Sequence, residues 1–207
     1  MSDLLVEFKK MIVEKRRGEL QAMLLSLPEE YALPVIFSQA VYPALNEVRQ
    51  LFRDRRIGLP ELILSLDLVR QTVEGLSNQS GSPERNQHVV LGVIEGDPHD
   101  MGKNIVRDVY RGYGFRVTDL GKNLSRDRFV SEVRERKPDL VGISTMMSTT
   151  VDLVGGAIDS IRKESQDVRI MVGGAFLNRE MAGRLGADGY AESVATLIEE
   201  TEAALGK

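Results

Sequence analysis

The spacing of apolar residues changes abruptly about 80 residues into the chain, and this change constrains the fold more than any other feature. After it, short runs rich in β-branched residues alternate with segments of about 12–20 residues that have helical spacing. The runs lie at 88–94, 115–118, 140–143 and 168–172, with a weaker fifth around 189–190. Because each run is apolar enough to be covered on both faces, the pattern predicts a parallel sheet with helices on either side. Five strands in about 120 residues favour the smaller, flavodoxin-like (Rossmann-like) order of a doubly wound α/β domain.

Residues 1–77 have helical periodicity and contain no convincing strand. Apolar residues recur on one face in four segments, at 4–12, 20–27, 33–52 and 60–76. Gly18 separates the first two segments, and Pro28 closes the second. Pro43 lies inside the third segment and predicts a kink there, whereas Pro60 suits the first turn of the fourth. Four amphipathic segments with short joints predict a small antiparallel four-helix bundle.

A polar segment separates these two regions. Residues 78–87 contain Gly81 and Pro83 and no apolar side chain to bury, which is typical of a linker. We therefore divide the chain into a helical-bundle domain at 1–77, a linker at 78–87 and an α/β domain at 88–207.

Composition excludes several classes of chemistry. The chain contains no cysteine and only two histidines, His88 and His99, so disulfides, zinc knuckles, iron–sulfur clusters and thiol catalysis are excluded. A net charge of −4 with interspersed signs argues against nucleic acid as a partner. No apolar stretch approaches the roughly 20 residues of a membrane helix, and the start lacks the apolar run of a signal peptide. We therefore expect a cytoplasmic protein without membrane or nucleic-acid partners.

The loop after the first predicted strand contains residues suited to bind a metal. In a doubly wound sheet, ligands bind at the carboxyl ends of the strands near the switch in strand order. Loop 95–104 contains His99, with Asp97 two residues before it and Gly102 three after it. A ligand imidazole needs one free nitrogen and one fixed by a carboxylate, and Gly102 would let a flat, bulky ligand lie against the backbone. The alternative is that His99 caps a helix that starts near Ile105, with Asp97 and Gly102 in a tight turn.

Two other strand ends carry residues that suit a ligand. Residues 144–150 contain five hydroxyl side chains and two methionines, and 173–175 is Gly-Gly-Ala. A hydroxyl cluster lines a polar slot, whereas a glycine pair lets a ligand approach the main chain. Each signal alone also fits a helix start or a turn. Together with the loop around His99, they predict one shared crevice.

The run GDPHDMGKNIV at 96–106 resembles the cobalamin-binding signature of corrinoid proteins, Asp-x-His-x-x-Gly. Ser144 and the glycine pair 173–174 follow in the order of that family. A helical bundle followed by such a domain resembles the small corrinoid subunits of methyltransferase systems and the matching modules of methionine synthase. The resemblance covers nearly the whole chain, and the extended run is typical of the methyl-carrying branch.

The resemblance implies particular roles for residues of the predicted crevice. His99 would be the lower axial ligand of cobalt in place of the cofactor's own benzimidazole. Asp97 would form a hydrogen bond with the imidazole nitrogen of His99 that does not bind cobalt, and Thr150 would complete this hydrogen-bond relay. Ser144 would border the buried nucleotide tail of the cofactor. The family's Ser-x-Leu reads Ser-Thr-Met here, so Met146 replaces a leucine. The full set of expected cobalamin-binding residues is Asp97, His99, Met101, Gly102, Ser144, Met146, Thr149, Thr150, Gly173, Gly174, Ala175 and Tyr190, with His99 as the metal ligand.

The resemblance also implies a function. Cobalt would accept a methyl group from a substrate-specific methyltransferase and donate it to a second methyltransferase, whose acceptor is tetrahydrofolate or a thiol. A reductive activating protein would be a further partner, and domain 1–77 would cap the cofactor. The chain would thus be a carrier subunit and would have no catalytic residue of its own.

Two alternatives remain open from the sequence. A cobalamin-dependent sensor would share this architecture, but such regulators usually add a DNA-binding segment and a tryptophan motif, and this chain has no tryptophan. A flavodoxin-like module without cobalamin would bind a flavin phosphate or act as a phosphorylated receiver. A receiver would have an aspartate at the end of the third strand, where this chain has Ser144, and a flavin module would have a Ser/Thr-rich loop at 97–99.

Overall fold

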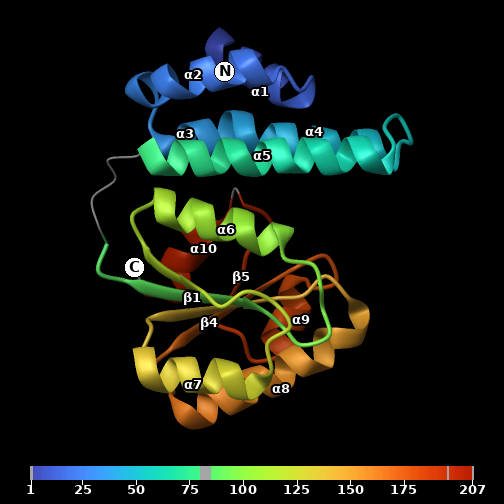
Figure 1. Ribbon diagram of the computed structural model, residues 1–207. Helices are drawn as coiled ribbons and strands as arrows, with labels where there is room; N and C mark the ends of the chain where they lie inside the picture. The colour runs from blue at the N-terminus through green and yellow to red at the C-terminus, as the bar shows by residue number, and fades with distance from the viewer. Residues whose placement is uncertain (1, 80–84, 195, 207) are drawn as a thin grey trace. The chain divides into compact units, whose positions relative to one another are not determined.

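A computed structural model describes residues 2–79, 85–194 and 196–206 and divides the chain into two compact units, Met1–Pro83 and Glu84–Lys207 (Figure 1). Half of the predicted linker 78–87, residues 80–84, lies outside the described residues. Its first two residues continue a helix, and its last three lead into the first strand.

The first unit consists of helices whose apolar faces pack on one another. In chain order these are α1 (Asp3–Val13), α2 (Arg17–Glu30), α3 (Leu33–Ile36), the π-helical turn η1 (Phe37–Val41), α4 (Tyr42–Arg53) and α5 (Leu59–Gln79). Since α3, η1 and α4 are continuous, they form one long helical segment, and the unit contains the four predicted segments. No helix among the described residues is long and apolar enough to cross a membrane.

Gly18 and Pro28 affect α2 differently from the prediction. Helix α2 starts at Arg17, so Gly18 lies in its first turn and does not interrupt it. The same helix continues past Pro28 to Glu30, because buried Leu24 and Leu27 offset one lost backbone hydrogen bond.

Pro43 coincides with an irregular turn. The π-helical turn η1 directly precedes α4, where Pro43 occupies the second position, and the N–H of Tyr42 bonds the carbonyl of Phe37 five residues back. A wider turn here fits a proline, which has no N–H for a bond four residues back and whose ring crowds that carbonyl.

The second unit is built on a five-stranded parallel sheet. Its strands are β1 (His88–Val93), β2 (Arg116–Asp119), β3 (Leu140–Ser144), β4 (Arg169–Gly173) and β5 (Gly189–Tyr190). The spatial order is β2-β1-β3-β4-β5, and every pair is parallel. This is the predicted flavodoxin-like order, including the weak fifth strand.

Helices cover both faces of this sheet (Figure 1). They are α6 (Met101–Gly112), α7 (Arg126–Arg136), α8 (Val151–Glu164), α9 (Arg179–Arg184) and α10 (Leu197–Ala204), with a 3-10 turn, η2 (Ser148–Thr150), before α8. Helices α7 and α8 lie on one face, and α6 and α10 lie on the other.

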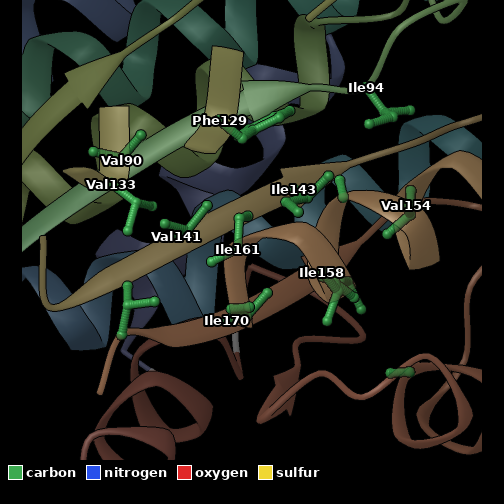
Figure 2. Close-up of a cluster of buried hydrophobic side chains, with 14 of the residues drawn as sticks. Val90, Ile94, Phe129, Val133, Val141, Ile143, Val154, Ile158, Ile161 and Ile170 are labelled. Carbon is green, nitrogen blue, oxygen red and sulfur yellow. The ribbon is translucent and has the colours of Figure 1, made fainter. Parts of the chain in front are cut away.

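A hydrophobic core lies between the sheet and helices α7 and α8 (Figure 2). It is made of buried branched and aromatic side chains that alternate along the strands, so that Val90 and Ile94 point into it while Val89, Leu91 and Val93 face the other side. The labelled members are Val90, Ile94, Phe129, Val133, Val141, Ile143, Val154, Ile158, Ile161 and Ile170. Burial of this set fixes the strand register and therefore the position of the loops at the strand ends.

Candidate functional site

The carboxyl ends of β1, β3 and β4 lie side by side. Val93 at the end of β1 pairs with Ser144 at the end of β3, and Ser144 pairs with Gly173 at the end of β4. The loops that follow these strands therefore start at one edge of the sheet, as the sequence predicts. The loops after β1 and β3 meet at the carboxylate of Asp97.

Asp97 holds the imidazole of His99. The Asp97 side chain is fully buried, and its Oδ1 accepts hydrogen bonds from Nδ1 of His99 at 2.8 Å and from the His99 backbone N–H at 2.9 Å. A carboxylate only accepts hydrogen bonds, so the proton of the neutral ring lies on Nδ1 and the lone pair on Nε2. The His99 side chain is 58% exposed, and within the described residues Nε2 has no hydrogen bond. The site thus presents one imidazole nitrogen that can bind a metal.

The second carboxylate oxygen of Asp97 is bound by the loop after β3. Oδ2 accepts hydrogen bonds from the Thr145 hydroxyl at 3.1 Å and from the backbone N–H of Met146. Burial alone would raise the pKa of Asp97, but the bonds from Met146, His99 and Thr145 outweigh it and lower the pKa below its ordinary value. Asp97 is therefore a carboxylate near neutral pH.

Thr150 lies one step further from Asp97 than the resemblance implies. Its hydroxyl is 2.5 Å from the Thr145 hydroxyl and 3.1 Å from the carbonyl oxygen of Met147, and it makes no hydrogen bond to Asp97. Thr145, which is not among the residues predicted from the sequence, occupies the intervening position. The hydroxyl cluster at 144–150 indicated a polar site in the sequence, but it did not show which hydroxyl contacts Asp97.

Gly102 and Gly173 leave open space, whereas Gly174 does not. Helix α6 starts at Met101, four residues before the predicted start, so Gly102 lies in its first turn. A Cβ at Gly102 or at Gly173 would meet no protein atom within 4 Å. At Gly174 the backbone has φ +137°, and a Cβ would lie 1.6 Å from the carbonyl oxygen of Thr145. Gly174 is therefore required for the close approach of two loops, while the packing of the chain itself does not require the other two.

The helix-cap interpretation of His99 does not match this geometry. The N-cap residue of α6 is Asp100, and its side chain makes no capping hydrogen bond. Asp97 does accept the backbone N–H of His99, as a tight turn would require, but it binds the ring as well.

Residues 87–199 match the B12 binding domain family. The chain belongs to the cobalamin-binding corrinoid proteins. Dimethylamine corrinoid protein 1 of Methanosarcina acetivorans is 31% identical over 195 residues, which cover 92% of this chain and 86% of the relative. The cofactor of this corrinoid protein is accordingly cobalamin.

Solved structures share the fold over both units. The monomethylamine corrinoid protein of Methanosarcina barkeri has a TM-score of 0.78 at 22% identity and covers 97% of this chain and 96% of its own. A chain of the methanol:cobalamin methyltransferase complex MtaBC from the same organism has a TM-score of 0.55 at 25% identity, covering 99% of this chain and 80% of its own.

The residues at the strand ends fit cobalamin. Among the described residues there is no group of three or more histidine, aspartate or glutamate side chains that could hold a free metal ion. A single accessible imidazole nitrogen instead suits a metal that a macrocycle already holds. The open spaces beside Gly102 and Gly173 lie at the same edge of the sheet, where a flat cofactor and its tail need room.

The other predicted residues lie around this edge with different exposure. Ser144 is the half-buried last residue of β3, and Met101 is the half-buried first residue of α6. Met146, Thr149 and Ala175 are exposed. These side chains are therefore available to a ligand to different degrees.

Two residues, Tyr190 and Phe176, are not placed as the sequence-based prediction of the site implies. Tyr190 is buried in β5, and its hydroxyl donates to the carbonyl oxygen of Leu177 at 2.9 Å, so this hydroxyl already has a partner within the fold. Phe176 directly follows Ala175 and is 53% exposed, and it is not among the residues predicted from the sequence. An exposed aromatic side chain has no periodic signal in the sequence and becomes apparent only in the structure.

Proposed function

We propose that this protein carries methyl groups between a substrate-specific methyltransferase and an acceptor methyltransferase, with His99 as the protein ligand to cobalt. The observation that carries the proposal is the imidazole whose Nδ1 is held by buried Asp97 and whose Nε2 is exposed. When bound, cobalamin supplies a cobalt centre that can accept and release a methyl group.

The residues of the chain would hold the cofactor and orient the imidazole that binds its cobalt. Asp97 would keep the proton of His99 on Nδ1, so that the lone pair of Nε2 is available to the metal. Gly102 and Gly173 leave space for the cofactor. We also propose that the predicted domain 1–77 serves as a cap over the cofactor, in line with relatives that match across both units.

The relatives favour methylated amines as the source of the methyl group. The name of the Methanosarcina acetivorans relative refers to dimethylamine, and it is 31% identical to this chain. The acceptor enzyme would use tetrahydrofolate or a thiol, and a reductive protein would return oxidised cobalt to its active state.

Paired histidine variants test the ligand. We expect the full chain to bind hydroxocobalamin in a one-to-one ratio. His99→Gln should weaken binding at least about 100-fold, since loss of partners behind a metal ligand alone costs about 10–100-fold. His88→Gln is the matched control and should bind as the natural protein does. Equal binding by both variants would contradict the ligand assignment.

A transfer assay tests the carrier role. The reduced holoprotein should become methylated when it is mixed with a methylamine and the methyltransferase that co-purifies with it, and His99→Gln should be methylated more slowly. Methylation with methanol and not with methylamines would overturn the donor class. A cobalamin complex that no methyltransferase methylates, but whose oligomeric state responds to light, would instead support a sensor.

A further inference from the structure

Thr145 is held rigidly between two strand ends. It is the first residue after β3 and is fully buried. Its N–H donates to the carbonyl oxygen of Gly173 at 3.0 Å, and its own carbonyl lies so close to Gly174 that no Cβ would fit there. The backbone of Thr145 is therefore fixed against the end of β4, and the register of β1 and β3 sets its position relative to Asp97.

The hydrogen bonds around Thr145 have one consistent direction. Asp97 can only accept, so the single hydroxyl proton of Thr145 points to Oδ2 of Asp97. The carbonyl oxygen of Met147, at 3.3 Å, is the competing acceptor, but a buried carboxylate forms the stronger, charge-assisted bond. The Thr145 oxygen is then free to accept the proton of Thr150 at 2.5 Å. The hydroxyls form a directed chain from Thr150 through Thr145 to Asp97.

We propose that Thr145 is a positioning residue of the cobalt ligand, which fixes the Asp97 carboxylate so that its other oxygen holds the His99 ring with Nε2 presented. The role of Thr145 rests on the proposed function of His99 as a ligand. Thr150 acts through Thr145 and not directly on Asp97. The assignment adds one residue to the relay that the resemblance implies, since that relay runs from His99 through Asp97 to Thr150 without Thr145.

Thr145 donates one of the four hydrogen bonds that hold the Asp97 carboxylate. The Met146 N–H also binds Oδ2, so loss of the Thr145 hydroxyl leaves the carboxylate with three of its four hydrogen bonds. We therefore expect an intermediate effect, with cobalamin affinity about 10-fold weaker, at the low end of the range for partners behind a metal ligand. Loss of the Thr150 hydroxyl should have a smaller effect, because Thr145 can still donate to Asp97.

The direct test reads the His99 ring in the full chain without cofactor. Nitrogen-15 NMR at neutral pH distinguishes the two neutral imidazole tautomers, and the natural protein should show the proton of His99 mainly on Nδ1. Thr145→Val and Thr145→Ala should increase the Nε2–H form and weaken hydroxocobalamin binding about 10-fold, and Thr145→Ser should restore both readings. Thr150→Val should change both readings less.

Thr118→Val is the matched control. The Thr118 hydroxyl lies 2.8 Å from Nε2 of His88, so its removal takes a hydroxyl from the other histidine of the chain. This variant should change the NMR signals of His88 and leave those of His99 and the cobalamin affinity unchanged. A merely general effect of losing a threonine hydroxyl would instead alter the His99 readings as well, and that result would overturn the proposal.

The outcomes separate this inference from the proposed function. If folded Thr145→Val and Thr145→Ala keep the His99 tautomer and cobalamin affinity of the natural protein, the inference is overturned even when methyl transfer proceeds. A Thr150→Val effect larger than that of Thr145→Val overturns it too. If the tautomer depends on Thr145 but no methyltransferase methylates the holoprotein, the inference stands and the carrier role fails.

Discussion

Strand β1 has a histidine at its start and another in the loop that follows its end, and the two imidazoles are in opposite environments. His88 is buried at the amino edge of the sheet, where Nε2 lies 2.8 Å from the Thr118 hydroxyl and Nδ1 has no hydrogen bond within the described residues. His99 lies at the carboxyl edge with Nδ1 held by Asp97 and its ring mostly exposed. Only the second ring combines a fixed nitrogen with an accessible one.

The comparison shows that the ability of a histidine to bind a metal here depends on its position in the sheet. Burial lowers the pKa of His88, as do the positive charges of Arg116 and Arg136, while Asp139 acts in the opposite direction. His88 is therefore a neutral ring without access to a ligand. At the carboxyl edge, the loops after β1 and β3 supply a carboxylate and its supporting donors, which is the general location of ligand sites in doubly wound sheets.

The largest expected difference in stability between the two edges of the sheet is between substitutions of two aspartates. At the carboxyl edge, Asp119 at the end of β2 binds Lys103, whose side chain is only 3% exposed. Asp119→Asn should lower the free energy of unfolding by about 3–5 kcal/mol, because it leaves a buried ammonium without its carboxylate. At the amino edge, exposed Asp139 accepts the N–H of His88 at 2.7 Å, and Asp139→Asn should cost less than about 1 kcal/mol.

Urea denaturation of the full chain, followed by circular dichroism, measures both values. The double variant with Lys103→Met and Asp119→Asn is the control, since removal of both charges should recover much of the loss. Equal losses for Asp119→Asn and Asp139→Asn would show that the Lys103 pair is not a distinguishing feature of the carboxyl edge.

The next largest effect separates two neighbouring glycines within the carboxyl edge. Gly174→Ala should lower the free energy of unfolding by about 2–3 kcal/mol, because φ is +137° and the added Cβ would collide with the Thr145 carbonyl. Gly173→Ala should change it by less than about 1 kcal/mol, since the added Cβ meets only open space, and should act on cobalamin binding instead. The same urea experiment on the cofactor-free chain compares them, and a larger loss for Gly173→Ala would contradict this division of roles.

The smallest effect is a difference in pH dependence between the two edges. The lowered pKa of His88 means that the unfolded chain takes up a proton first as the pH falls below the ordinary value of 6.5, so stability falls from that point downward until the folded ring is also protonated. Burial would raise the pKa of Asp119, but Lys103, the Gly121 N–H and Arg107 outweigh it and lower it. Its stabilising contribution is therefore full above its ordinary value of 3.8 and is lost as the pH falls through the lowered value.

Unfolding measured across pH 7 to 2 should thus show two separate declines, to which each titrating group contributes a slope of at most about 1.4 kcal/mol per pH unit. His88→Gln should remove the upper decline, and Asp119→Asn should make the lower one shallower without abolishing it, because Asp97 also has a lowered pKa. An upper decline that persists in His88→Gln would show that another group causes it.

The sequence predicted those features that depend on neighbours along the chain. Strand and helix periodicity is local, and it placed β1, β3 and β4 within one or two residues of their observed limits. Asp97 and His99 lie in one loop, so their contact could be anticipated from their spacing. The parallel order of the sheet followed from the alternation of strands and helices.

Features that depend on distant contacts could not be predicted in this way. Thr145 meets Asp97 across 48 positions of sequence, through the register of β1 and β3, and Gly174 meets Thr145 through the register of β3 and β4. The start of α6 was misplaced because its first fully buried apolar residue is Ile105. The preceding turn carries Gly102 and the buried ion-paired Lys103, which have no apolar periodicity.

The identity of the nitrogen on cobalt is the most direct test of the account. The full chain, labelled with nitrogen-15 only in histidine, would be reconstituted with unlabelled hydroxocobalamin and reduced by one electron, and its electron paramagnetic resonance spectrum would be recorded. We predict that the axial nitrogen splits each cobalt line in two, as a spin-½ nucleus does, and that this pattern persists in His88→Gln and disappears in His99→Gln. A three-line splitting from the unlabelled benzimidazole in the natural protein would contradict the central claim.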